Sequence, residues 1–117
     1  MNSTTPLDTM KLYYRVERIY NELRELGYED GASLDVEALF PFDQYHLAGT
    51  DPVAAAIEPA SIVSTSRVLD VGSGLGGPAR YLAHRVGCHV TAIEIQRNVH
   101  EVALDLTVRC GLSDRVE

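Results

Sequence analysis

The chain has 117 residues, the length of one small domain, and 45% of them are hydrophobic, a proportion usual for a soluble globular protein. Its 10 basic and 17 acidic side chains give a formal net charge of -7, which repels phosphate backbones and argues against a nucleic acid partner. No segment approaches the roughly 20 apolar residues that a membrane span needs, and the polar start of the sequence lacks the features of a signal peptide. We therefore expect a cytoplasmic protein that binds a small molecule, with no nucleic acid or membrane partner.

Helical patterns dominate the first half of the chain. Apolar residues spaced alternately four and three apart predict an amphipathic helix that begins near Pro6. Gly27 is expected to end this helix as a C-terminal cap. The apolar face consists of Leu12, Val16, Ile19, Leu23 and Leu26.

Two shorter helices are expected before residue 60. The first covers about Ser33–Leu39, because a proline two residues later disfavours helical backbone. The second has Asp51 as its N-terminal cap and Pro52 in its first turn, and it continues until Pro59 intervenes. A loop over residues 41–50 joins them.

The pattern changes after residue 65, where strands begin to alternate with helices. Arg67–Val71 predicts a short buried strand that runs directly into a glycine-rich turn, and Pro78–Gly87 predicts the helix that follows. His89–Glu94 is rich enough in β-branched residues to predict a second strand. A further helix is expected over Arg97–Cys110, and Asp114–Glu117 resembles the start of a third strand.

This order of elements predicts an α/β protein. Alternating strands and helices are typical of a doubly wound parallel sheet, in which right-handed crossovers place helices on both faces. We expect residues 1–65 to form an N-terminal helical segment with a cofactor-covering loop, and residues 66–117 to form the first part of a Rossmann-like domain. Because no later strand is present to cover the open edge of the first strand, we also expect self-association through that edge, or a longer parent protein.

The turn after the first strand is a candidate nucleotide site. A turn that presses its backbone against a ligand needs glycine, and Gly72, Gly74, Gly76 and Gly77 all qualify. The turn satisfies both the dinucleotide pattern G-x-G-x-x-G and the tighter D-x-G-x-G-x-G, which begins at Asp70. Glycine spacing alone does not choose between the two ligand classes.

Charge favours S-adenosylmethionine (SAM) over a dinucleotide. Asp70 lies at the carboxyl end of the first strand, where a dinucleotide places an anionic pyrophosphate and SAM places a cationic ammonium and sulfonium. The alternative for Asp70 is a carboxylate that only accepts hydrogen bonds from the loop. Glu94 follows the second strand, 22 residues after Gly72, where an acid can accept hydrogen bonds from ribose hydroxyls, or can simply be solvated.

A family resemblance supports the same cofactor. Residues 68–80 resemble motif I of class I SAM-dependent methyltransferases, and Glu94 matches the second acidic position of that family. The loop at residues 43–49 resembles the segment that precedes motif I in methyltransferases similar to glycine and sarcosine N-methyltransferases and to quinone-type C-methyltransferases, although Ala48 departs from the expected Gly-Gly pair. The resemblance covers residues 43–117 and matches the N-terminal portion of such enzymes. It implies that the loop folds over the methionine end of the cofactor.

The expected cofactor-binding residues come from both regions. In the loop, Gln44 and His46 either contact the cofactor or pack on the sheet. Arg80 is expected to face solvent, with the SAM carboxylate as its alternative partner. No catalytic residue is assigned, and no metal site is expected. The predicted cofactor-binding residues are Asp70, Gly72, Ser73, Gly74, Gly76, Glu94, Gln44 and His46.

These observations predict transfer of a methyl group from SAM to a small molecule. The resemblance implies that later strands supply most of the acceptor pocket, so the chain is expected to be the SAM-binding N-terminal part, and its activity as an enzyme on its own is left open. The alternative is a non-catalytic nucleotide-binding or self-associating module left by truncation. An oxidoreductase that uses NAD is a third interpretation, which Asp70 disfavours.

Overall fold

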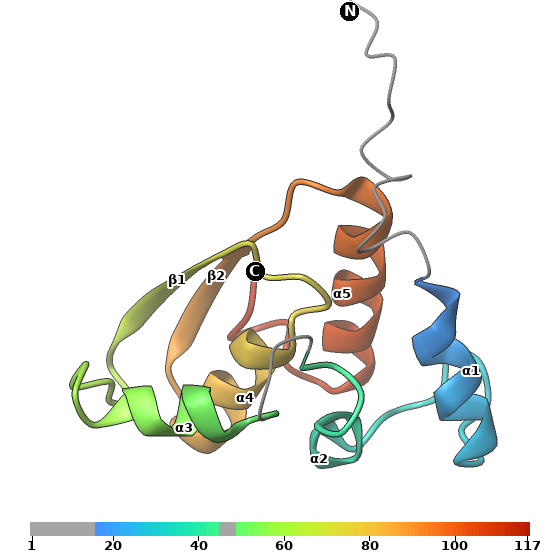
Figure 1. Ribbon diagram of the computed structural model, residues 1–117, viewed down its shortest axis with the longest axis horizontal. Coiled ribbons are helices and arrows are strands. Elements are labelled where there is room, and N and C mark those ends of the chain that lie inside the picture. The colour runs from blue at the N-terminus through green and yellow to red at the C-terminus, as the bar shows by residue number, and fades with distance from the viewer. Residues whose placement is uncertain (1–15, 45–48) are drawn as a thin grey trace, which may run out of the picture.

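A computed structural model of the chain describes residues 16–44 and 49–117, which form helices packed on a small parallel sheet (Figure 1). The elements in chain order are α1 (Glu17–Glu25), α2 (Val36–Leu39), α3 (Asp51–Ile57), β1 (Arg67–Val71), α4 (Gly77–Arg85), β2 (His89–Ile93) and α5 (Arg97–Arg109). The predicted α/β order is confirmed, with both strands within one residue of their expected bounds. None of the helices described is both long and apolar enough to cross a bilayer.

Strand β2 lies between β1 and the last residues of the chain. The two strands pair in parallel, with Val68 opposite Val90. On the other side of β2, the N–H of Val90 donates to the carbonyl of Arg115 at 2.8 Å, and the N–H of Ala92 donates to that of Glu117 at 2.7 Å. The expected third strand therefore begins here, while the outer edge of β1 has no strand partner among the described residues.

Helices α4 and α5 cover the same face of the sheet (Figure 1). Val68 and Val90 point into an apolar cluster with Ala79 and Leu82 of α4. This is the arrangement expected for the start of a doubly wound sheet, because consecutive right-handed crossovers that move in one direction along a sheet place their helices on one side.

The opposite face of the sheet is apolar and exposed. The exposed fractions are 60% for Leu69, 74% for Val71 and 49% for Ile93. The prediction that β1 is a buried strand is therefore wrong. Its side chains alternate between the covered face and the open face, as the two-residue period of a strand requires.

Helix α1 packs against α5 through the predicted apolar face. Ile19 and Leu23 are buried in a cluster that includes Leu106 of α5. Leu26 was expected on this face but is 52% exposed, because the helix ends at Glu25. The chain then turns away through Gly27, which has φ +95°. The start expected near Pro6 lies outside the described residues.

The two short helices begin one to three residues away from their predicted starts. Helix α2 begins at Val36 rather than near Ser33, because Asp35 is the cap and its side chain accepts a hydrogen bond from the N–H of Glu37 at 3.0 Å. In α3, Asp51 is the first helical residue and not the cap, which is Thr50.

One apolar cluster draws on both halves of the chain. Its buried members come from α1, from residues 34–39, from the glycine-rich turn and from α5. The division into residues 1–65 and 66–117 therefore stays a prediction. In the structure, α1 and residues 34–39 pack with α5 in this cluster, whereas α3 packs against α4. The buried members are Ile19, Leu23, Leu34, Leu39, Leu75, Val99, Val102 and Leu106.

Candidate functional site

The first two glycines of the turn present bare backbone to open space. Gly72 has φ +72° and Gly74 has φ +58°, a left-handed conformation that side chains rarely adopt. A Cβ built on either residue would have no heavy atom within 4 Å. The two positions therefore form an open cradle of bare backbone.

The last two glycines of the turn face the protein interior. A Cβ on Gly76 would lie 2.7 Å from Nη1 of Arg80, and a Cβ on Gly77 would lie 2.2 Å from the backbone oxygen of Asp43. Both distances are too short for any side chain. Internal packing is thus sufficient to explain this pair of glycines, of which Gly76 is among the predicted cofactor-binding residues.

The turn is anchored on the end of β2. The N–H groups of Gly72 and Ser73 both donate to the carbonyl of Ile93 at 2.9 Å. Glu94 accepts from the N–H of Gly74 through Oε1 and from the N–H of Gln96 through Oε2, each at 2.9 Å. A carboxylate offers about four acceptor positions, so roughly two remain for a ligand.

Asp70 and Glu94 flank the turn from neighbouring strands. Asp70 is half-buried near the carboxyl end of β1, opposite Ala92 of β2, and Glu94 comes directly after β2. Because the carboxyl ends of parallel strands meet at one edge of the sheet, both acids lie at the edge that carries the turn. The structure thus brings together the two acids that the sequence singled out.

The segment before α3 also reaches the turn. Asp43 is buried, at 1% exposure, and its N–H donates to the carbonyl of Leu39 at 3.0 Å. A Cβ on Gly77 would lie 2.6 Å from Nε2 of Gln44, which places Gln44 beside the turn, as expected. His46 lies outside the described residues.

Arg80 is the residue that sequence reasoning placed wrongly. Its side chain is fully buried instead of solvent-facing, and Nη2 lies 3.1 Å from Oδ2 of Asp43, which is also fully buried. The same Nη2 donates to the carbonyl of Leu75, inside the turn, at 2.6 Å. Burial raises the pKa of the Asp43 carboxyl, and the Arg80 charge opposes that rise. No local feature of the sequence indicates that Arg80 is buried, because Asp43 lies 37 residues earlier.

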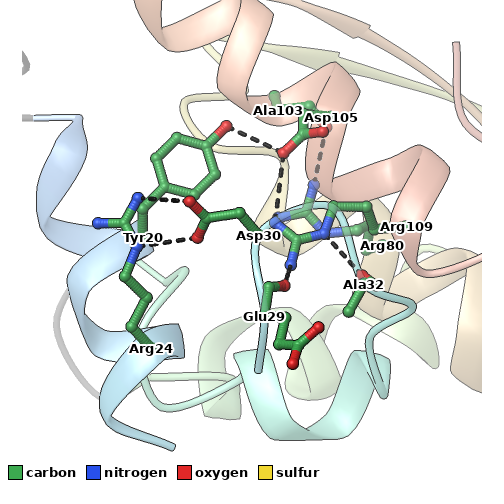
Figure 2. Close-up of polar contacts among 9 residues, drawn as sticks. All are labelled: Tyr20, Arg24, Glu29, Asp30, Ala32, Arg80, Ala103, Asp105 and Arg109. Atoms are coloured by element: carbon green, nitrogen blue, oxygen red, sulfur yellow. Dashed lines mark hydrogen bonds and ion pairs between the residues drawn. The ribbon is translucent and has the colours of Figure 1, made fainter. Parts of the chain in front are cut away.

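A polar cluster joins α1 to α5 beside the site. Figure 2 shows Tyr20 pointing toward Asp105, and its hydroxyl donates to Oδ2 of Asp105 at 3.0 Å. Arg109 lies 3.5 Å from the same oxygen and donates through Nε to the carbonyl of Ala32 at 2.7 Å. Burial and the hydrogen bond to Asp105 raise the pKa of Tyr20 to about 12. These contacts hold α1 and the segment that contains Ala32 on α5.

The sequence is similar to several curated methyltransferases. Methyltransferase GfsG of Streptomyces halstedii is 36% identical in an alignment of length 108 that covers 80% of this chain and 38% of that protein. The glycine/sarcosine/dimethylglycine N-methyltransferase of Actinopolyspora halophila is 40% identical over 52 residues, which are 44% of this chain and 9% of that protein. The chain therefore spans well under half the length of these relatives. No family model matches it.

Solved structures show the same relationship. An RNA methyltransferase from Salinibacter ruber, in complex with S-adenosyl-L-homocysteine, is 29% identical with a TM-score of 0.54, over 57% of this chain and 44% of that chain. Phosphoethanolamine N-methyltransferase 2 of Haemonchus contortus, in complex with SAM, is 26% identical with a TM-score of 0.57, over 84% of this chain and 23% of that chain. The predicted resemblance to class I SAM-dependent methyltransferases is confirmed, and the chain matches a part of such proteins.

Proposed function

We propose that this chain is the SAM-binding part of a methyltransferase that acts on a small molecule. The observation that carries the proposal is the open cradle at Gly72 and Gly74, flanked by Asp70 and Glu94, in a chain that resembles methyltransferases. Both acids are matched to a ligand that is cationic and has no phosphate. A dinucleotide would instead bring its pyrophosphate toward these carboxylates.

We propose a distinct role toward SAM for several of the predicted residues. We propose that the acceptor positions left on Glu94 receive the ribose hydroxyls, and that Asp70 faces the cationic part of the cofactor. Ser73 lies between the two cradle glycines, and Gly76 follows in the same turn and packs against Arg80. Gln44 and His46 are proposed to cover the methionine end. The proposed set is Asp70, Gly72, Ser73, Gly74, Gly76, Glu94, Gln44 and His46.

A small-molecule acceptor is supported by the names of the relatives. They include methyltransferases of glycine, sarcosine and phosphoethanolamine. When bound, SAM supplies a methyl group on a sulfonium, and an enzyme of this kind mainly orients the acceptor behind that methyl and excludes water. We propose that residues of this chain hold and orient the cofactor for that reaction. That the protein has no nucleic acid partner is a further proposal, supported by the net charge of -7, and a cytoplasmic location is proposed beside it.

Isothermal titration with SAM, S-adenosylhomocysteine and NAD tests the proposal. We expect SAM and S-adenosylhomocysteine to bind and NAD not to bind. Asp70→Asn and Glu94→Gln should each weaken binding about tenfold or more, because each removes a charged acceptor from the site. Glu101→Gln, an exposed acid on α5, is the matched control and should leave binding unchanged. Binding of NAD without SAM would refute the proposal.

A second candidate function is a self-associating module. It is supported by the apolar open face of the sheet and by the outer edge of β1, which has no strand partner among the described residues. Association through this edge and face would bury side chains that are now in water. It is compatible with cofactor binding, because the cradle lies at the carboxyl ends of the strands.

A further inference from the structure

Arg80 connects three parts of the fold at the glycine turn. Besides its contacts to Leu75 and Asp43, its Nη1 donates to Oγ1 of Thr107 at 3.1 Å and to the carbonyl of Ala103 at 3.3 Å. Thr107 and Ala103 belong to α5. One buried guanidinium thus holds the turn, the preceding segment and α5 in a fixed relationship.

Asp43, the ion-pair partner of Arg80, fixes the orientation of the Gln44 side-chain amide. Nε2 of Gln44 donates to Oδ1 of Asp43 at 3.0 Å. Because an ionised carboxylate only accepts hydrogen bonds, the amide must turn its nitrogen toward Asp43. Its oxygen, Oε1, is buried and has no hydrogen-bond partner among the described residues. A buried acceptor in this condition costs free energy until a donor reaches it.

We propose that Arg80 and Asp43 are positioning residues of the cofactor site, which fix the amide of Gln44 so that Oε1 accepts a hydrogen bond from the ammonium group of the cofactor. This inference rests on the proposed function. The ammonium is the donor that fits, because ribose and adenine belong to the nucleoside end, which is proposed to lie at Glu94. Glu94 contacts Gly74 near the start of the turn, whereas Gln44 lies at Gly77, where the turn ends.

Arg80 acts on Gln44 through the charge of Asp43. Loss of the guanidinium would raise the pKa of the Asp43 carboxyl further, because burial already raises it and the Arg80 charge is the largest cause that opposes the rise, so the protonated form would become more favourable. A protonated carboxyl can donate as well as accept, so it would no longer impose one orientation on the amide of Gln44. The ion pair therefore joins two segments and also keeps the Gln44 amide in one orientation.

The test compares two nucleosides that differ at one end. S-adenosylhomocysteine carries the ammonium group, and 5′-methylthioadenosine has the same nucleoside and sulfur without the amino acid. In isothermal titrations, Arg80→Met, Asp43→Asn and Gln44→Met should each weaken S-adenosylhomocysteine about tenfold and change 5′-methylthioadenosine less than about twofold. Arg85→Met, on the same helix but with a half-exposed side chain, is the matched control and should change neither.

The ratio of the two affinities decides the outcome. Equal losses of affinity for both nucleosides would mean that the Arg80–Asp43 pair contributes only to stability. Unchanged affinities would mean that the pair does not position Gln44. Either result overturns the inference. If the single variants do not fold, the double variant D43N/R80M removes both charges together and avoids an unpaired buried ion. It should show the same selective loss.

A measurement without ligand separates this inference from the proposed function. If the unmodified protein binds neither nucleoside, the proposed function fails, and exchange of the Gln44 side-chain amide protons is followed by NMR instead. Faster exchange in Arg80→Met than in Arg85→Met, with equal exchange at backbone amides of β2, would support the positioning role. Equal exchange of the Gln44 amide in both variants would overturn it.

Discussion

The individual glycines of the turn are required for different physical reasons. Gly72 and Gly74 need positive φ and leave open space, whereas Gly77 has no room for a Cβ because of the Asp43 carbonyl. The sequence shows the same residue type at each position, so it predicts the turn and not this division. The division separates positions that face open space from positions that hold the fold.

Gly77→Ala should destabilise the protein strongly. The new Cβ would lie 2.2 Å from the backbone oxygen of Asp43. A backbone oxygen cannot rotate away as a flexible side chain can, so the segment at Asp43 must move. We expect a loss of more than about 2 kcal/mol in the free energy of unfolding, measured by urea denaturation. Gly87→Ala is the control, because at φ +80° with its nearest atoms at 4.0 Å it should cost only about 1 kcal/mol. A smaller loss for Gly77→Ala than for Gly87→Ala would contradict the packing argument.

The sequence predicted the positions of the two acids of the site, but not the position of Arg80. Asp70 and Glu94 could be placed because strand ends define one edge of a sheet. Arg80 could not be placed, because its burial depends on Asp43, which lies 37 residues earlier. An ion pair formed across that separation leaves no local pattern in the sequence.

At the scale of elements, strands and long helices were predicted well and short helices were not. The bounds of β1 and the start of α5 follow from local pattern, and both agree with the structure. The start of α2 depended on which of two polar residues, Ser33 or Asp35, serves as cap, and local sequence allows either. The exposure of β1 depends on what covers the sheet, which the sequence of the strand does not contain.

The contact between α1 and α5 should weaken in alkaline solution. Tyr20 has a pKa of about 12 in the folded protein, above its ordinary value of 10.0, so the unfolded chain loses the proton first as pH rises. Stability from this group is fully present below pH 10 and is lost between about pH 10 and 12. Urea denaturation across this range should show a steeper fall for the unmodified protein than for Tyr20→Phe.

The size of this effect is limited by the exposure of Tyr20. At neutral pH, Tyr20→Phe should cost about 1 kcal/mol, the usual value for one lost hydrogen bond. Asp105→Asn should reduce the alkaline fall, because it removes the carboxylate that keeps the tyrosine protonated. If Tyr20→Phe and the unmodified protein lose stability in parallel above pH 10, the hydrogen bond does not join the helices in solution.

At the scale of the whole molecule, the sheet is covered on one side. Exposed apolar side chains continue from β2 to Ile95, which is 73% exposed. Patches of this kind on a protein surface mark sites of interaction. The fold of the described residues thus leaves one face ready for further chain or for a second copy.

Self-association through this face should depend on charge. Val71→Lys places a cation at the most exposed large apolar side chain of β1, where burial against another copy would be unfavourable. Sedimentation velocity should show a lower mass for this variant if the unmodified protein associates through the open face. Arg67→Lys, on the same strand and exposed, is the control and should leave the mass unchanged. A monomeric unmodified protein would remove the self-association proposal.

The anchoring of the turn by Glu94 has a kinetic consequence. Since its carboxylate already ties down the N–H groups of Gly74 and Gln96, the cradle exists before any cofactor arrives. Little ordering entropy is then lost on association. Entry of the ligand should be a single bimolecular step, with an observed rate that rises linearly with concentration and shows no plateau from a preceding rearrangement.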